Sequence, residues 1–225
     1  MRRILAILIG PLLGCAVLVA QTTPAIQATG NSTINVTPDQ AQLSIGVVTQ
    51  GTTAQEAGTL NATLSNTVQN ALKSVLGLSG TIQTVGYSVY PRYSSGNTQT
   101  IIGYTASNTV QVTTTNLSII GTLIDTANQA GANSVSGVTF GLQNPDPVLQ
   151  QALAAASKQA LAHAAAIANG LGLTTGAVIS AQEGSSYTPV ITGNAPTTTS
   201  TTPIQTGTVG VSATVTVTVG VGAAR

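Results

Sequence analysis

Residues 209–219 have the sequence VGVSATVTVTV, and this stretch decides the fold class. Valine or alanine occupies every second position from Val209 to Val219, and glycine, serine or threonine lies between them. Successive side chains of a β-strand point to opposite faces, so a period of two predicts one buried apolar face and one polar face. The stretch therefore predicts a half-buried strand, and with it a sheet.

Six further segments have strand-like alternation or composition and are bounded by turn residues. Residues 26–36 and 41–48 flank Pro38-Asp39 and are predicted to form an N-terminal hairpin. Residues 81–93 and 101–114, joined by the polar loop at residues 94–98, are predicted to form a second hairpin. The expected strands are residues 26–36, 41–48, 81–93, 101–114, 134–140, 177–181 and 209–219.

Three segments have the features of helices. The first begins at the capping box Thr53-Ala54-Gln55-Glu56, in which the Glu56 carboxylate is expected to reach back to the Thr53 amide, and it ends at Gly77. The second spans about 117–130 and is closed by Gly131. The third opens at Asp146-Pro147, with Asp as N-cap, and ends at Gly172. The apolar stripe predicted for the third helix is Leu149, Leu153, Ala156, Ala160, Ile167 and Leu171.

The elements follow the order ββαββαβαββ. This order predicts an α+β fold with a mixed, mainly antiparallel sheet of about seven strands and three helices packed on it. Residues 21–225 are expected to form a single domain. Residues 185–207 are rich in Thr, Ser and Pro and poor in large apolar groups, so a flexible loop is expected there.

Residues 1–20 have the composition of a secretory signal peptide, with a positively charged start at Met1-Arg2-Arg3 and an apolar run to Ala20. We expect cleavage after Ala20 and a location in the periplasm, at the outer membrane or outside the cell. Leu12-Leu13-Gly14-Cys15 also resembles a bacterial lipoprotein box, which would make Cys15 a lipidation site. The apolar run continues past Cys15, which favours an ordinary signal segment. Membrane attachment is expected only through this segment or a lipidated Cys15.

Charge is scarce throughout residues 21–225. The basic residues are Lys73, Arg92, Lys158 and Arg225, and the acidic residues are Asp39, Glu56, Asp125, Asp146 and Glu183. Charged residues make up 5% of the chain, against about 25% in a typical soluble domain. Nucleic-acid binders cluster Lys and Arg, whereas these cations are scattered, so nucleic acid is not an expected partner. An uncharged polar surface resists self-association weakly, and a homo-oligomer is expected.

The sequence contains none of the common catalytic motifs. It has no Gly-x-Ser-x-Gly elbow, no HExxH and no phosphate-binding glycine loop. His163, the one histidine, is expected to pack the side of its imidazole ring beside the apolar stripe of the third helix. One ring nitrogen is then expected to be solvated or hydrogen-bonded. The acids are dispersed, although two of them meeting in space, as in glycosidases, remains an alternative. We therefore expect no enzymatic activity, no catalytic residues, no cofactor and no metal.

One group of side chains suits an interaction surface. We define Tyr87, Tyr90, Arg92, Tyr93 and Tyr104 as the tyrosine patch. Tyr and Arg are enriched at interface hot spots, so the patch is a candidate contact surface. Alternatively, these tyrosines are ordinary β-formers, half buried with the hydroxyl at the sheet edge. Pro91 predicts that the arm lies at a sheet edge or strand end.

Several short motifs occur in a fixed order along the chain: residues 28–30, 38–43, 46–47, 57–61, 82–84, 87–93, 102–108, 130–133 and 203–204. Taken in this order, they resemble the SIMPL-domain family of exported bacterial proteins. The resemblance implies an exported α+β protein without established catalytic residues, assembly into oligomers, and protection against oxidative stress. It identifies no active site. A binding module for a peptide, glycan or signalling partner is the alternative function.

Overall fold

The alternating stretch at the C-terminal end forms β7 (Thr208–Ala223), the central strand of a three-stranded sheet. In this computed structural model, which describes residues 24–95, 100–192 and 202–223, β7 pairs with β1 (Ala25–Val36) and with β6 (Leu173–Thr192). All pairing is antiparallel. Val215, Val217 and Val219 are buried, and the threonines between them are partly exposed on the other face. The predicted two-faced strand is confirmed.

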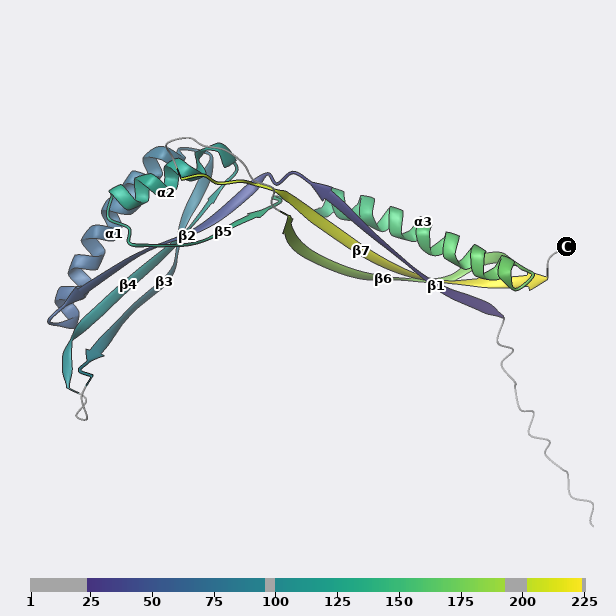
Figure 1. The fold of residues 1–225 in the computed structure, drawn as a ribbon, viewed down its shortest axis with the longest axis horizontal. Coiled ribbons are helices and arrows are strands. Elements are labelled where there is room, and N and C mark those ends of the chain that lie inside the picture. The colour runs from purple at the N-terminus through teal and green to yellow at the C-terminus, as the bar shows by residue number, and fades with distance from the viewer. Residues whose placement is uncertain (1–23, 96–99, 193–201, 224–225) are drawn as a thin grey trace, which may run out of the picture.

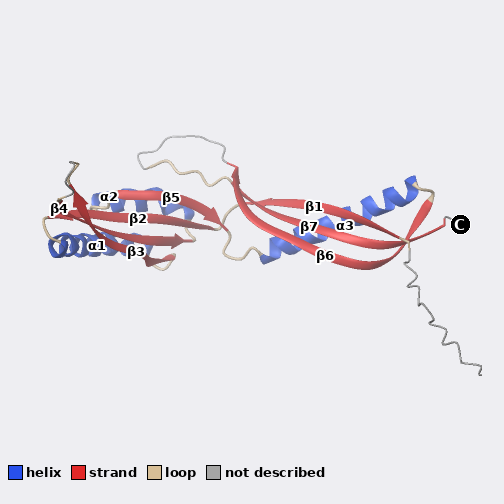
Figure 2. Cartoon of the chain, turned by 90° about the horizontal axis from the view of Figure 1, so that it is seen from below, coloured by secondary structure: helices blue, strands red, loops and turns tan. Residues whose placement is uncertain are grey.

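The other four strands form a second sheet, ordered β3-β4-β2-β5. They are β2 (Gln40–Gly51), β3 (Gly80–Tyr93), β4 (Ile101–Thr114) and β5 (Ser134–Gly141), again all antiparallel. The hairpin of β3 and β4 is confirmed. Two sheets lying end to end replace the single sheet expected from the element order (Figures 1 and 2). The α+β class and the order ββαββαβαββ are confirmed.

The predicted N-terminal hairpin is wrong, because β1 pairs with β7 whereas β2 pairs with β4 and β5. Pro38 is buried, and the Asp39 amide donates to the Gly141 carbonyl at the end of β5. The Pro38-Asp39 segment thus carries the chain from one sheet to the other. Alternation predicts which faces are buried, but it contains no information about partners.

Helices α1 (Ala54–Leu76) and α2 (Ile120–Gln129), the latter preceded by a 3-10 turn (Leu117–Ile119), lie on one face of the four-stranded sheet (Figure 1). We call residues 40–141 the four-stranded lobe. Its core consists mainly of large aliphatic side chains, with one Phe and a few alanines. The fully or nearly fully buried members include Leu43, Ile45, Val68, Leu72, Val112, Ile120, Leu123 and Phe140.

Helix α3 (Asp146–Gly170) covers one face of the other sheet, and with β1, β6 and β7 it forms the three-stranded lobe (Figure 1). Its buried stripe consists only of alanine, at four-residue spacing: Ala152, Ala156, Ala160, Ala164 and Ala168. The predicted stripe is confirmed over its first half, since Ala156 and Ala160 are buried and Leu149 and Leu153 pack against them. It is wrong at Ile167 and Leu171, which are 44% and 65% exposed. Small side chains let the helix backbone approach the sheet more closely than Leu or Ile would allow.

The backbone of α3 comes very close to β1 at Gly30. A Cβ atom at this position would lie 2.1 Å from the Ala156 carbonyl oxygen and 2.5 Å from the Ala160 nitrogen. No side chain larger than hydrogen fits there without moving α3, since real Cβ contacts do not come below 3.0 Å. The alanine stripe and Gly30 together set the position of α3.

The four-stranded lobe is inserted in sequence between β1 and α3 of the other lobe. The segment before β7 also contacts it, since Thr202 donates through its hydroxyl to Asp125 Oδ1 (2.8 Å) and Ile204 packs against the core. The single domain expected for residues 21–225 stays a prediction.

Two predicted segments are placed differently or lie outside the described residues. β6 runs to Thr192, so the flexible loop predicted for 185–207 is wrong over 185–192. Residues 202–207 are without regular structure, and residues 193–201 are outside the described part. The predicted signal peptide and Cys15 are outside it too. None of the helices in the described part combines the length and hydropathy that a membrane crossing requires.

Candidate interaction surfaces

The face of the four-stranded sheet opposite α1 and α2 is polar and nearly uncharged. Pairing places Gln42, Gln111 and Thr139 on this open face, and Gln111 Nε2 donates to Gln42 Oε1 (3.3 Å). Arg92 is the only charged residue in the four strands. Hydrogen bonding and aromatic contact are therefore what this face can offer a partner.

The structure divides the tyrosine patch between two faces. Tyr87 pairs with Asn108, in register with the buried Val110 and Val112, and its hydroxyl would be 3.2 Å from a Cβ added at Gly58 of α1. Tyr87 thus lies on the helix side, as does the half-buried Tyr104 by its place in the same alternation.

Tyr90 and Arg92 lie on the open face. Tyr90 pairs with Thr105, which also pairs with Gln50, and the Arg92 guanidinium donates to Gln50 Oε1 across the sheet. Tyr90 is 66% exposed, more than Tyr87 at 59% or Tyr93 at 49%. Tyr93 follows a register irregularity. The tyrosine patch is therefore not one surface, and Tyr90 and Arg92 are the pair of its members that share the open face.

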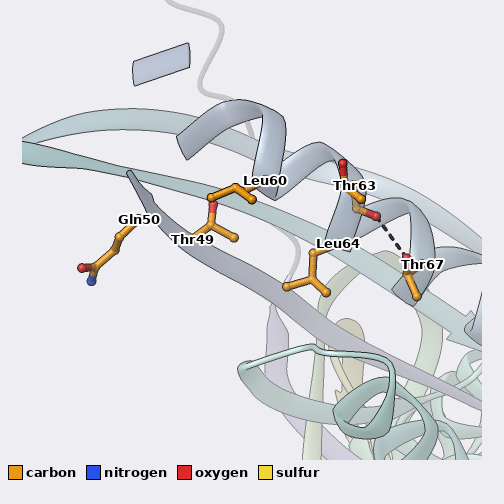
Figure 3. A pocket seen from close by; sticks show the side chains of 6 residues that line it. All are labelled: Thr49, Gln50, Leu60, Thr63, Leu64 and Thr67. Carbon is orange, nitrogen blue, oxygen red and sulfur yellow. Dashed lines mark hydrogen bonds between the residues drawn. The ribbon is translucent and has the colours of Figure 1, made fainter. Parts of the chain in front are cut away.

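A shallow groove of about 430 Å³ runs between α1 and the end of β2 (Figure 3). Leu60 and Leu64 reach from the helix over Thr49, while Gln50 points away from it. Thr63 and Thr67 complete the lining, which contains no titratable group. The groove can hold an apolar group but supplies no acid, base or nucleophile.

His163 is exposed on α3, and its Nδ1 lies 2.8 Å from the Thr29 carbonyl oxygen. A carbonyl only accepts, so Nδ1 carries the proton and donates. Of the two states expected for a ring nitrogen, solvated or hydrogen-bonded, Nδ1 has the second. Among the described residues no three His, Cys, Asp or Glu side chains gather as a metal site.

Two of the acids, Asp39 and Asp125, accept hydrogen bonds through their carboxylates, and a third, Asp146, does not have the role predicted for it. Asp39 Oδ1 accepts the Gln143 amide (2.7 Å), a contact that holds the loop after β5. The prediction that Asp146 is the N-cap of α3 is wrong, because Pro145 occupies that position and makes no side-chain hydrogen bond there. The Asp146 amide donates instead to Asn144 Oδ1. Asp125 accepts the Thr202 hydroxyl, and no sequence signal marks that contact, because the two residues are 77 positions apart.

The capping box of α1 is confirmed in one half. Thr53 Oγ1 accepts the Glu56 amide (3.1 Å), but the carboxylate bonds chiefly to Thr52, accepting its amide and its hydroxyl at 2.7 Å each. These bonds from Thr52, and secondarily from the Thr53 backbone, hold the pKa of the exposed Glu56 carboxyl below its usual value. Glu56 is thus structural, as expected.

Asn61 of α1 is a fully buried polar residue that sequence patterns do not single out. Its Nδ2 donates to the carbonyls of Val47 (2.8 Å) and Ala106 (3.1 Å), and Ser65 Oγ donates to its Oδ1 (3.2 Å). The amide therefore ties α1 to two neighbouring strands at one point. Asparagine at this place in a helical pattern is typical of a solvent-facing residue, so its burial has no sequence signal.

The longest strand of the described chain, β6, forms an edge of its sheet. Its residues 174–184 are all exposed, with Val178 at 52% and Ile179 at 55%. Ser180 to Ser186 pair with β7 in unbroken register. Within residues 173–184 no side chain of the described part bonds to the outer backbone edge of β6, and Glu183 is the only charge in the strand. Such an edge is open to strand addition.

Comparison with known proteins gives one family match and several relatives. A family model described as SIMPL, Protein of unknown function (DUF541), matches residues 26–219 and so spans both lobes. The "26 kDa periplasmic immunogenic protein" of Brucella melitensis biotype 1 is 30% identical over 169 residues, covering 72% of this chain and 68% of the relative. The protein of the same name from Brucella abortus has the same identity and coverage. "Uncharacterized protein YggE" of Escherichia coli K12 is 29% identical over 184 residues, covering 77% and 73%.

Proposed function

Because this chain belongs to the SIMPL family, with relatives named as periplasmic, we propose that it is a non-enzymatic periplasmic protein that self-assembles. Assembly uses the free edge of β6, where the strand of a second copy extends the three-stranded sheet. The observation that carries the proposal is the length, exposure and low charge of this edge strand. Natural proteins usually blunt such edges with charge, proline or a covering element.

Strand addition suits a chain with so little charge. Backbone hydrogen bonds supply the affinity in this mode of recognition, and alternate side chains supply the specificity. Over residues 173–184 the side chains are small or aliphatic apart from Gln182 and Glu183, so two copies meet without charge clusters that would repel each other.

The test is sedimentation velocity of residues 21–225 at micromolar concentration. Wild type is expected to sediment as an oligomer, and Ile179→Lys with Gln182→Lys is expected to shift it to the monomer because lysines on an edge strand oppose pairing. Ala25→Lys with Gln27→Lys on β1 is the matched control, with exposed residues on the other edge strand, and it should leave the mass unchanged. A monomeric wild type would refute self-assembly.

The proposal includes the absence of catalysis. Residues 21–225 contain no cysteine, so protection against oxidative stress, which the family resemblance implies, would not run through a thiol. Purified protein is expected to consume peroxide no faster than buffer does. Catalytic turnover without an added metal or cofactor would show that an enzymatic site exists.

A binding module is the second candidate, and the open-face pair Tyr90 and Arg92 favours it. An exposed aromatic beside a guanidinium is a typical anchor for a peptide or a sugar. Tyr90→Ala should abolish capture on a glycan array or in a periplasmic pull-down, whereas Tyr87→Ala, on the other face, should retain it. Equal capture by both variants, or none by wild type, would remove this candidate.

A further inference from the structure

Helix α3 touches more than the covered face of its sheet. Gln159 and His163, one helical turn apart, reach around β1 to its backbone. Gln159 Oε1 accepts the Asn31 amide (2.6 Å), and His163 Nδ1 donates to the Thr29 carbonyl (2.8 Å). These two backbone groups flank Gly30, where the backbone of α3 lies close to the strand.

Both backbone groups belong to the outer edge of β1. Thr29 pairs with Thr216 and Asn31 with Thr214, and in each pair the side chains bond to each other, at 3.0 Å and 2.8 Å. Such close side chains are typical of antiparallel pairs whose amides and carbonyls point away from the partner strand. The groups that α3 binds are therefore the ones that an added strand would need.

We propose that Gln159 and His163 are an edge cap, which closes β1 to strand addition and leaves β6 as the edge of the three-stranded sheet that accepts a partner. The cap sits in the middle of the 12-residue strand and divides its outer edge into two short pieces. A second example of the same chemistry supports the proposal. Asn133 accepts the Val48 amide (2.8 Å) and donates to the Val48 carbonyl (2.7 Å), next to the end of the pairing between β2 and β5.

The caps replace the charges that usually protect sheet edges. The seven strands contain two charged residues, Arg92 and Glu183, and neither lies on β1 or β2. Side-chain amides and an imidazole occupy backbone groups directly, so they close an edge without placing charge on it. The alanine stripe is the condition for this arrangement, since a bulkier stripe would hold Gln159 and His163 farther from β1.

Sedimentation velocity and light scattering test the edge cap with Gln159→Ala and His163→Ala combined. With the cap removed, β1 becomes a second open edge, and particles at least twice the mass of the wild-type particle are expected at equal concentration. Gln151→Ala with Lys158→Ala, exposed residues of the same helix, is the matched control and should keep the wild-type mass. Circular dichroism confirms that each variant is folded.

A conservative variant separates capping from helix stability. Gln159→Glu retains an acceptor for the Asn31 amide, so it should keep the wild-type mass, whereas Gln159→Leu should increase it. A folded double variant with the wild-type mass would overturn the edge cap. The capping of β1 is tested separately from self-assembly through β6, because a monomeric wild type with a heavier double variant would refute the assembly and support the cap.

Discussion

In the four-stranded lobe, α1 and α2 pack on the sheet through fully buried side chains such as Leu72, Ile120 and Leu123. In the three-stranded lobe the fully buried residues of α3 are all alanine, and its Leu149 and Leu153 are only partly buried beside them. Large side chains fill space between helix and sheet. Alanine leaves little space to fill, and the helix backbone comes close to Gly30. The same layer arrangement is therefore stabilised by bulk in one lobe and by close approach in the other.

The difference extends to the polar contacts. In the four-stranded lobe a buried amide, Asn61, bridges the helix to two strands from inside the core. Among the described residues of the three-stranded lobe no polar side chain of this kind is buried, and the amide and imidazole of α3 act at the sheet edge instead. Close approach moves the polar contacts of the helix from the core to the edge.

The largest expected effect breaks the close-packed lobe. Gly30→Val places a side chain against the α3 backbone and should lower the free energy of unfolding by about 3 kcal/mol. Gly86→Val on β3 is the control, because a Cβ there would have its nearest neighbour at 4.0 Å, and it should change stability by less than about 0.5 kcal/mol. Urea unfolding followed by circular dichroism measures both. Equal midpoints for the two variants would refute the close approach.

The next effect tests the buried amide of the other lobe. Asn61→Leu leaves the Val47 and Ala106 carbonyls without their donor, and a loss of about 2 kcal/mol is expected. Asn66→Leu, an exposed position on the same helix, should cost much less. A neutral Asn61→Leu in urea unfolding would show that the amide contributes bulk and not hydrogen bonding.

A smaller effect is expected at the edge of β2. Asn133→Ala removes both bonds to Val48 and should cost about 1 kcal/mol. Hydrogen exchange at the Val48 amide should accelerate, while Asn128→Ala, an exposed residue of α2, should leave it unchanged. An unaltered exchange rate in Asn133→Ala would mean that the amide does not protect this edge.

The smallest effect is a pH dependence confined to the start of α1. Hydrogen bonds from Thr52 lower the pKa of the folded Glu56 carboxyl. Its stabilisation is therefore present above the unfolded pKa and is lost as the pH falls through the folded pKa. The stability difference between wild type and Glu56→Gln should be largest at neutral pH and shrink in acid. The neighbouring Gln55→Ala changes no titrating group, so its stability difference from wild type should be the same at neutral and at acid pH. A Glu56→Gln difference that grows in acid would contradict the assignment.

Patterns in the sequence predict the elements well and their partners poorly. Alternation in residues 209–219 marks β7 with its buried face, since a period of two reports burial directly. It cannot show that β7 pairs with β1, 187 residues away at Thr29 and Thr216. The predicted stripe of α3 is wrong only in the second half of the helix, where Ala164 and Ala168 are buried in place of Ile167 and Leu171. Large aliphatic residues outrank alanine in a hydrophobic pattern, whereas close packing of the helix on the sheet favours the smaller residue.

The candidate surfaces show the same limit. Composition locates Tyr90 and Arg92, and the odd spacing from Tyr87 to Tyr90 is enough to separate those two faces. The spacing does not show which of the two faces of β3 the helices cover. A register irregularity between Thr84 and Gly86 shifts the alternation of side chains within this strand. Gln159 and Asn133 cannot be distinguished from solvent-facing amides, because their partners are backbone groups, which have no sequence signature. A local role such as that of Glu56 is the easiest to assign.

Hydrogen exchange of wild type at two concentrations, one at which the chain is monomeric and one at which it is assembled, tests the central claim most directly. We predict that peptides covering residues 178–184 of β6 gain protection on assembly, and that peptides covering residues 27–33 of β1 do not. Protection gained along β1, or an assembled particle with no added protection in β6, would contradict the claim that the chain assembles through one open edge while α3 closes the other.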